Sequence, residues 1–286
     1  MTFGFIAAEK ARHSVRRLCA ALAVSPSGFY AWQQRGPTAR VLQDHALTGQ
    51  LRLVHADSRG TYGRPRLQRA LVRRGYRLSE KRVARLMRQA HLAARGRRRW
   101  RRTTIADPSA VGRNTLARRF QVATPNTVWA ADITALWTAE GWHYLAILLD
   151  LASRRVVGWA LGKVADTHLV LAALERALVS RKPAPGLLHH SDRGVQYTSA
   201  TYHARLAAAG ISISLSRAGN CWDNAPVESF FSSLKAEALP AQSWRTGHDA
   251  RMAIESHLQF YNERRLHSSL AYRTPAEHER QWHATV

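Results

Sequence analysis

The sequence predicts an α/β fold, a mixed five-stranded sheet with flanking helices, preceded by an all-α helix-turn-helix-like basic region. Three observations support this prediction. Positive charge is concentrated before residue 121, three closely spaced strand-like segments follow, and segments with helical and strand spacing then alternate. A strand meander followed by alternating helices and strands is typical of a mixed sheet that helices cover on both faces.

The charge distribution divides the chain into two parts. Residues 1–120 contain 27 Lys and Arg against 5 Asp and Glu, a net charge of +22. Residues 121–286 contain 16 against 14, a net charge of +2. A strongly basic part indicates a polyanionic partner, with nucleic acid the first expectation and an acidic membrane surface the second. The nearly neutral part holds most of the carboxylates, and we expect the chemistry there.

Composition also argues against several classes of protein. Cys19 and Cys221 form no CxxC pair, which disfavours a zinc module and a disulfide framework and favours a reducing compartment. The N-terminal stretch lacks the basic region of a secretory signal before its apolar residues. The longest apolar run, YLAILLDLA, is too short to cross a bilayer. We therefore expect a cytoplasmic protein without a membrane partner.

Residues 1–42 predict an N-terminal segment of short helices. Val15, Leu18 and Leu22 form an apolar stripe, and a Ser-Pro-Ser-Gly turn precedes a group of aromatic residues. This pattern fits a helix-turn-helix, but it fits a purely structural helical hairpin equally well, because two short helices are a weak signal.

Residues 43–95 predict a basic helix-turn-helix-like DNA-binding domain. Leu67, Leu71 and Val72 have helical spacing. Gly75 suits the C-terminus of that helix, and Ser79 can cap the next one. The second helix has an apolar side made of Val83, Leu86, Met87 and Leu92.

Basic residues cover the predicted exposed faces of these two helices. They are Arg66, Arg69, Arg73, Arg74, Lys81, Arg82, Arg85 and Arg88. A face of one sign suits a duplex groove, although a merely solvated helix pair is the alternative. The DNA-binding candidates within this set are Arg66, Arg69, Arg73, Lys81, Arg82 and Arg85.

Residues 96–120 predict a basic linker. The block RGRRRWRR, at residues 95–102, has six arginines in eight positions. Such a block is usually disordered alone, and a phosphate backbone is its natural counter-charge. Arg97, Arg98 and Arg99 are therefore further candidate DNA contacts. Trp100 either stacks on a base or packs on the next domain.

Residues 121–282 predict a second domain, with a core at 121–240 and a helical extension at 241–282. Alternating apolar residues mark strands at 127–137, 142–149 and 156–161, joined by tight turns. A helix at 167–180, a strand at 187–190, a helix at 199–210 and a strand at 211–215 follow. Asn224 or Asp223 can cap a further helix that begins near residue 225.

Two aspartates lie within and after these strands. Asp132 interrupts the first strand, where a local arginine or a backbone amide would be its ordinary partner. Residues 121–150 contain no Lys or Arg, so a bound metal ion is a natural counter-charge. Asp192 follows the fourth strand, where sites in α/β sheets collect, but an Asp-Arg-Gly turn alone is more often only a turn. His189 and His190 lack the spacing of a zinc site.

A third carboxylate lies on the helix after residue 225. Its buried stripe, at about 100° per residue, consists of Val227, Phe230, Phe231 and Leu234. Glu228 falls at the edge of that stripe, and Lys235 lies seven residues later, almost in line with it. Asp223 and Glu237 compete for the same role, but Glu237 points about 180° away from Glu228. The alternative is that Glu228 and Lys235 form a pair on the helix surface without a function.

Hard oxygen ligands without soft ones favour Mg²⁺, with Mn²⁺ as a substitute. Two such ions can clamp a phosphodiester: one lowers the pKa of the attacking water or 3′-hydroxyl, and the other stabilises the leaving oxygen. Together with the basic part of the chain, this pattern predicts phosphodiester chemistry on DNA.

Three motifs carry a family resemblance: WAADIT with Asp132, HSDRGVQYTS with Asp192, and GNCWDNAPVESFFSSLK with Glu228. Together they resemble the DDE catalytic core of bacterial insertion-sequence transposases, which are similar to retroviral integrases, and above all the OrfB product of the IS-three family. The 35 residues 193–227 between the last two acids match the family spacing, and Lys235 matches the family's basic residue. LDLASRRVVGWAL and the tail YNERRLHSSLAYRTPAEH also look like family signatures.

The resemblance implies a ribonuclease H-like fold and a two-metal mechanism. Asp132 would bridge two Mg²⁺ ions, Asp192 and Glu228 would each complete one, and Lys235 would contact DNA near the cut. The implied activity is DNA cleavage at the ends of an insertion sequence, followed by attack of the freed 3′-hydroxyl on a target. A non-catalytic DNA-binding regulator and a structure-selective nuclease of the same fold are the alternatives.

The resemblance also implies partners. The OrfA product would supply end recognition, as a fusion or an associated subunit, and the synapsis of two ends requires at least a dimer. We expect the protein in the bacterial cytoplasm, at the nucleoid. His189 and His190 become neighbours of the site that touch DNA or order Asp192. Gln196 and Tyr197, in a loop expected at residues 194–199, become candidate DNA contacts.

Overall fold

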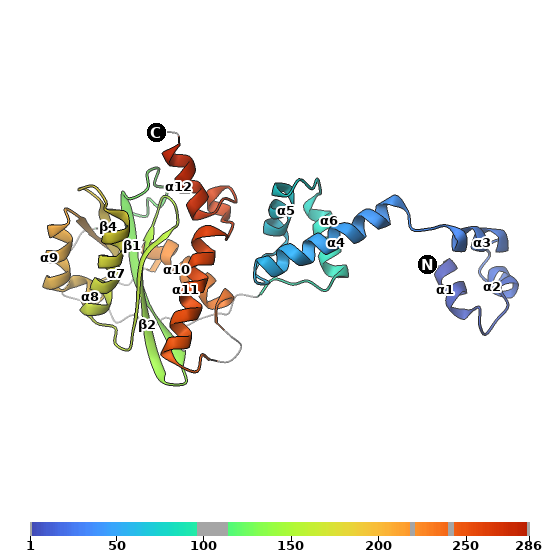
Figure 1. The fold of residues 1–286 in the computed structure, drawn as a ribbon, viewed down its shortest axis with the longest axis horizontal. Helices are drawn as coiled ribbons and strands as arrows, with labels where there is room; N and C mark the ends of the chain where they lie inside the picture. The colour runs from blue at the N-terminus through green and yellow to red at the C-terminus, as the bar shows by residue number, and fades with distance from the viewer. Residues whose placement is uncertain (1, 96–113, 218–220, 240–242, 285–286) are drawn as a thin grey trace.

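The computed structural model describes residues 2–95, 114–217, 221–239 and 243–284. Figure 1 shows a small N-terminal helical cluster at one end, a second helical unit in the middle, and a sheet with its helices at the other end. The first cluster contains α1 (Thr2–Glu9), α2 (Val15–Ala21) and α3 (Pro26–Gln34), packed around Ile6, Cys19 and Phe29. Among the described helices, none is long and apolar enough to cross a membrane.

The Ser-Pro-Ser-Gly stretch is the first turn of α3, and its prediction as a separate turn is wrong. Ser25 is the N-cap, and its hydroxyl accepts a hydrogen bond from the Gly28 amide at 3.0 Å. Pro26 is tolerated there because the first amides of a helix have no partner within the helix.

The middle unit consists of α4 (Ala39–Asp57), α5 (Arg64–Arg73) and α6 (Glu80–Gln89). Ser79 caps α6 by accepting from the Arg82 amide, and Gly75 ends α5 with a positive φ of +87°, as the sequence predicts. Helix α4 has no counterpart in the sequence prediction, and it crosses the boundary expected between residues 42 and 43. Val72, predicted on the apolar side of α5, is 44% exposed.

A mixed five-stranded sheet forms the core of the second domain, as predicted. Its strands are β1 (Val128–Thr138), β2 (Gly141–Asp150), β3 (Val156–Gly162), β4 (Leu188–Ser191) and β5 (Ser212–Leu215). The strand order is β3-β2-β1-β4-β5. The first three strands are antiparallel to their neighbours, whereas β4 runs parallel to β1 and β5 runs parallel to β4.

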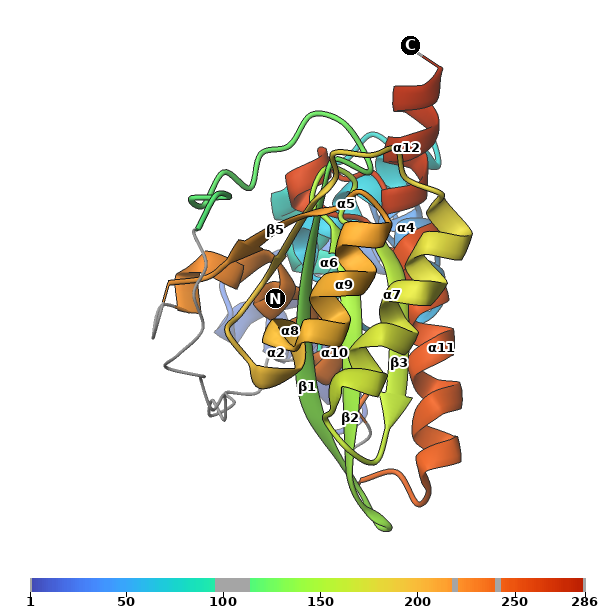
Figure 2. The same ribbon diagram turned by 90° about the vertical axis from the view of Figure 1, so that its left-hand side faces the viewer.

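Helices cover both faces of this sheet (Figure 2). One face packs against α7 (Thr167–Arg181) and α9 (Ala200–Ala208) around Trp129, Ala131 and Tyr202. The other face packs against α10 (Ala225–Glu237) and α11 (Gly247–Glu263) around Ala130, Leu136 and Phe230. Leu116 belongs to this second core, although the sequence places it in the linker. Residues 96–113 of that linker lie outside the described residues.

The C-terminal extension connects the sheet to the middle helical unit. After α11, the chain forms a short 3₁₀ turn (Ser268–Leu270) and α12 (Pro275–His283). Phe260 and Leu266 are buried in the same core cluster as residues of α4, α5 and α6. The Tyr62 hydroxyl accepts from the Leu266 amide at 2.7 Å and donates to the Arg264 carbonyl at 3.1 Å.

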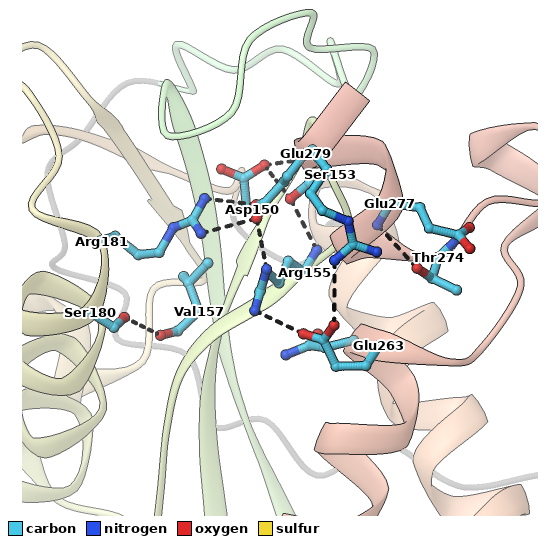
Figure 3. Close-up of polar contacts among 12 residues, drawn as sticks. Asp150, Ser153, Arg155, Val157, Ser180, Arg181, Glu263, Thr274, Glu277 and Glu279 are labelled. Atoms are coloured by element: carbon cyan, nitrogen blue, oxygen red, sulfur yellow. Dashed lines mark hydrogen bonds and ion pairs between the residues drawn. The ribbon is translucent and has the colours of Figure 1, made fainter. Parts of the chain in front are cut away.

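A polar network holds α12 against the turn between β2 and β3 (Figure 3). Glu279 binds Arg155 at 2.9 Å and Arg181 at 2.7 Å, and Arg155 also binds Glu263. Asp150, fully buried, accepts from the amides of Asn126 and Ser153. Its carboxylate therefore stabilises the turn that the sequence predicts at DLASRR. Burial raises the pKa of Asp150, and the hydrogen bonds from Ser153 and Asn126 oppose this shift.

Candidate active site and nucleic-acid interface

Asp132 lies on β1 and points to the sheet face that packs against α10. Successive residues of a strand point to opposite faces. Ala130 and Leu136 belong to the core under α10 and α11, so Asp132, an even number of residues from both, shares their face. Its carboxylate is partly buried and accepts from the Ile133 amide at 2.8 Å.

Asp192 lies beside Asp132, at the end of the neighbouring strand. In the parallel pairing of β1 and β4, Ala130 lies opposite His190. Asp132 follows Ala130 by two residues, and Asp192 follows His190 by two residues. The two acids therefore lie at the same level of the sheet. Burial is the main cause that raises the pKa of Tyr197, and the charges of Asp132 and Asp192 add to it, so both carboxylates lie near this ring.

Glu228 and Lys235 both lie on α10, over the face that contains Asp132. Each is partly buried. Burial lowers the pKa of the Lys235 amine, and the charge of Asp132 opposes that shift, so Lys235 lies near Asp132. Seven residues are close to two helical turns, which puts Glu228 on the same side of α10 as Lys235. The sheet and α10 thus bring the three predicted acids to one region.

Asp223 and Asn224 hold the start of α10 in place. Asn224 occupies the predicted N-cap position, but its side chain does not cap the helix. Asn224 makes no capping hydrogen bond; its Nδ2 donates to the Ala131 carbonyl at 3.0 Å, next to Asp132. Asp223 accepts from Arg118 and Arg217, each at 2.8 Å. Arg217 is the main cause that lowers the pKa of Asp223. Sequence reasoning missed both positioning roles, since Ala131 and Arg118 are distant in the chain and no local pattern pairs Asp223 with Arg217.

Glu237 is not the third acid of the site, because it is paired with an arginine. It forms a buried ion pair with Arg265, whose nearest oxygen–nitrogen distance is 2.6 Å. This agrees with the opposite orientation expected from the helical spacing.

His189 and His190 are core residues, so the expectation that they touch DNA is wrong. His189 is 1% exposed and His190 is fully buried. The Tyr202 hydroxyl lies 2.9 Å from His189 Nε2, and the hydroxyls of Ser214 and Ser216 lie 2.9 and 3.1 Å from the two ring nitrogens of His190. Burial lowers the pKa of His189 to about 3 and that of His190 to about 4, so both are neutral near pH 7.

The segment after Asp192 is also different from the expected loop. Residues Val195–Thr198 form the one-turn helix α8. Tyr197 is 3% exposed and packs edge-on against Tyr202, so its ring is not available for the DNA contact predicted for it. Gln196 is partly exposed, and its Nε2 donates to the Ala165 carbonyl at 2.6 Å.

The described residues, which include all three acids, contain no group of three or more His, Cys, Asp or Glu side chains close enough to hold a metal ion. The carboxylates share a region, but they do not form a ready-made cluster of three ligands.

Several predicted DNA contacts of the middle unit bind partners within the protein. Arg82 and Arg85 both bind Asp44 of α4, at 2.8 and 2.6 Å, so the basic face is not of one sign. Arg73 binds Glu277 of α12 at 3.0 Å. Arg66 lies over the Tyr62 ring and Arg69 over the Tyr272 ring, whereas Lys81 is exposed. Arg97, Arg98 and Arg99 lie outside the described residues.

Comparison with known proteins identifies the two domains. Models described as integrase core domain match residues 123–221 and 209–275, and one described as HTH-like domain matches residues 42–100. The transposase InsF of insertion sequence IS3A from Escherichia coli K12 is 36% identical over 98% of this chain and 98% of its own length. The chain belongs to the IS3 family of insertion-sequence transposases.

Other relatives agree with this assignment. The transposase for IS629 of Shigella sonnei is 34% identical over 96% of this chain and 94% of its own length. An uncharacterized 31 kDa protein of insertion element IS600, also from Shigella sonnei, is 38% identical over 93% of this chain and 98% of its own length. The HTLV-2 integrase catalytic core in complex with magnesium is similar to 54% of this chain, covering 97% of its own, with 17% identity and a TM-score of 0.42.

The IS3-family chain is therefore a transposase with an integrase core domain and an HTH-like domain. The predicted α/β fold is confirmed, with a mixed five-stranded sheet, helices on both of its faces, and a helical HTH-like region before it.

Proposed function

We propose that this transposase cuts DNA at the ends of its insertion sequence and joins the freed 3′-hydroxyl to a target. Asp132, Asp192 and Glu228 would hold two Mg²⁺ ions for this reaction, and Mn²⁺ would substitute. The observation that carries the proposal is that Asp132 lies on the sheet face that α10 covers, while Asp192 follows the neighbouring strand at the same level.

The donor set fits Mg²⁺. This ion prefers oxygen ligands, retains several waters, and is usually held by one or two carboxylates together with substrate phosphates. Asp132 and Asp192 can therefore begin a site before DNA arrives, and Glu228 would complete it with the substrate in place. When bound, the ions would activate the attacking oxygen and stabilise the leaving oxygen.

The chain's own residues would position the DNA and the ligands. Asn224, through its hydrogen bond to the Ala131 carbonyl, fixes the start of α10 relative to β1. Lys235 would bind a phosphate near the cut. Further DNA contacts would come from Gln196 and from the basic candidates Arg66, Arg69, Arg73, Lys81, Arg82, Arg85, Arg97, Arg98 and Arg99.

We extend the proposal to partners and location. The OrfA product would be a fused or associated subunit that helps to recognise the element ends. Holding two ends together requires at least a dimer on DNA. The protein would act in the bacterial cytoplasm, at the nucleoid.

Substitution of each acid tests the proposal. Asp132→Asn, Asp192→Asn and Glu228→Gln should each lower strand transfer at least ~100-fold, because a stabiliser of transition-state charge is lost. The readout is joining of a duplex that carries the element's terminal inverted repeat, measured beside binding of the same duplex. The matched control is Glu255→Gln, which changes an exposed acid of α11 and should retain activity.

The outcomes separate the alternatives. Activity retained in all three acid variants would contradict the assignment of the metal site. DNA binding without calorimetric uptake of Mn²⁺ or Mg²⁺ would favour a non-catalytic regulator. Hydrolysis of branched DNA without any joining would favour a structure-selective nuclease.

A further inference from the structure

A basic pocket lies where the middle helical unit, α10 and the C-terminal tail meet. It has a volume of about 340 Å³, near the lower end of the range for ligand pockets in proteins. Its polar lining includes Arg66 of α5, Arg154 of the β2–β3 turn, and four residues of the tail: Arg265, His267, Ser268 and Ser269. The tail residues belong to the YNERRLHSSLAYRTPAEH motif, whose role the proposed chemistry leaves unexplained.

Three guanidinium groups line this pocket, and Arg66 and Arg154 give it a positive potential, because Glu237 neutralises the charge of Arg265. Arg154 is fastened by a hydrogen bond from its Nη2 to the Phe120 carbonyl at 3.0 Å. Arg265 is 3% exposed and paired with Glu237. The described residues that line the pocket include no Asp or Glu, so positive charge exceeds negative charge around it. Fixed cations of this kind favour an anionic ligand.

His267 gives an independent indication of a ligand. It is 7% exposed, it lines the pocket, and its Nε2 has no hydrogen-bond partner. A buried polar atom without a partner is unfavourable, and a ligand that binds it removes this cost. Burial first, and then the charges of Arg265, Arg66 and Arg154, lower the pKa of His267, so all three arginines act on the same small volume.

The pocket adjoins the helix that contains Glu228. Pro226, Ser229 and Ser233 of α10 line it. At about 100° per residue, Ser229 lies about 100° and Ser233 about 140° around α10 from Glu228, so the pocket lies across the helix from that acid. An anion in the pocket would therefore lie about one helix diameter, ~10 Å, from the proposed site of cutting. That separation corresponds to about three base pairs of duplex DNA.

We propose that this pocket binds one phosphodiester group of the DNA backbone and so fixes the register of the strand that enters the active site. The inference rests on the proposed function, because it takes DNA as the substrate. Arg66 and Arg154 supply the charge, and the Ser269 hydroxyl supplies a short-range hydrogen bond. Free inorganic phosphate has the same chemistry, and the experiment must distinguish it from DNA.

The salt dependence of DNA binding by the full chain tests this proposal. Each phosphate contact contributes about 0.9 to the slope of log affinity against log salt concentration. Arg66→Gln and Arg154→Gln should each lower that slope by about this amount, measured by fluorescence anisotropy with a labelled duplex. The matched control is Arg280→Gln, which removes the same charge from an exposed arginine of α12 outside the pocket and should keep the slope.

A second pair of variants avoids the removal of a buried group. Arg154 also binds Phe120, so its replacement affects folding as well as charge. Ser269 is exposed at the edge of the pocket. Ser269→Asp places a carboxylate there, and Ser269→Asn places a neutral amide of the same shape. The carboxylate variant should bind DNA at least about tenfold more weakly than the amide variant, because a phosphate would face a like charge.

Three results would overturn the inference. The first is an unchanged salt slope in both arginine variants, and the second is equal DNA affinity of the two Ser269 variants. The third is that inorganic phosphate raises the melting temperature only when the pocket is intact, while DNA binding is the same with and without the pocket. The last would assign the pocket to free phosphate. Failure of the proposed function looks different, since the acid variants would then still join DNA while the pocket variants changed only binding.

Discussion

Buried histidines make the stability of this protein depend on pH. Burial is the main cause that lowers the pKa of four of them: to about 3 for His189, about 4 for His190, about 3 for His257 and about 2 for His267. Each folded-state pKa lies below the unfolded value of about 6.5. As the pH falls from about 6.5 toward the folded value, only the unfolded state takes up the proton. The free energy of unfolding is therefore highest above about pH 6.5, and it decreases as the pH falls from there toward the folded-state pKa.

His257 offers the clearest test of this behaviour. It is fully buried in α11, and neither ring nitrogen has a hydrogen-bond partner among the described residues. His257→Leu should flatten the rise of unfolding free energy with pH by about 1.4 kcal/mol per pH unit near pH 5.5, measured by urea denaturation. His248→Leu, on the exposed side of the same helix, is the control. An equal slope in His257→Leu and the wild type would contradict the account.

The sequence predicts three candidate acids, but it does not predict whether the residues around them are buried or exposed. Asp132 is recognisable because residues 121–150 contain no Lys or Arg, and Asp192 and Glu228 are recognisable by the 35 residues that separate them. Tyr197 has polar neighbours in the sequence, yet the fold turns its ring into the core beside Tyr202. Burial of that kind depends on contacts between distant segments, which no local pattern contains.

At the scale of elements, strand alternation and helical spacing predict most of the sheet domain to within two residues. The expected strand at 156–161, for example, is observed at Val156–Gly162. Helix α4 was missed because polar residues interrupt its apolar positions, and only packing against α5 and α6 buries Leu47, Leu51 and Val54. The β1–α10 junction depends on a side chain, Asn224, that resembles an ordinary cap.

Replacement of Asn224 tests how this junction affects the site. Asn224→Ala removes the bond to Ala131, so strand transfer at saturating DNA should fall at least ~10-fold while DNA affinity is retained. The matched control is Asn262→Ala, which removes a similar helix–strand tether, with bonds to the amide and carbonyl of Val156 at 3.0 Å, far from the acids. Both variants should lose ~1–3 kcal/mol of stability. Equal strand transfer in the two would show that Asn224 has only a structural role.

At the scale of the whole molecule, long-range contacts join the HTH-like domain to the integrase core. Arg73 and Glu277 pair across 204 positions of sequence, and Tyr62 binds the backbone on both sides of Arg265. The sequence predicts a basic region and a neutral one, but not these contacts, because either partner alone looks like a solvated surface residue. Arg73, a predicted DNA contact, therefore also holds the two domains together.

The central claim is that Asp192 is a ligand of a catalytic metal ion, and a change of metal preference tests it most directly. Asp192→Cys replaces a hard oxygen ligand with a softer sulfur, which Mn²⁺ tolerates better than Mg²⁺ does. Strand transfer by this variant should be lost with Mg²⁺ and recover at least ~10-fold when Mn²⁺ replaces it, relative to the same exchange in the wild type. Equal activity of the variant with both ions, or wild-type activity with Mg²⁺, would contradict the account.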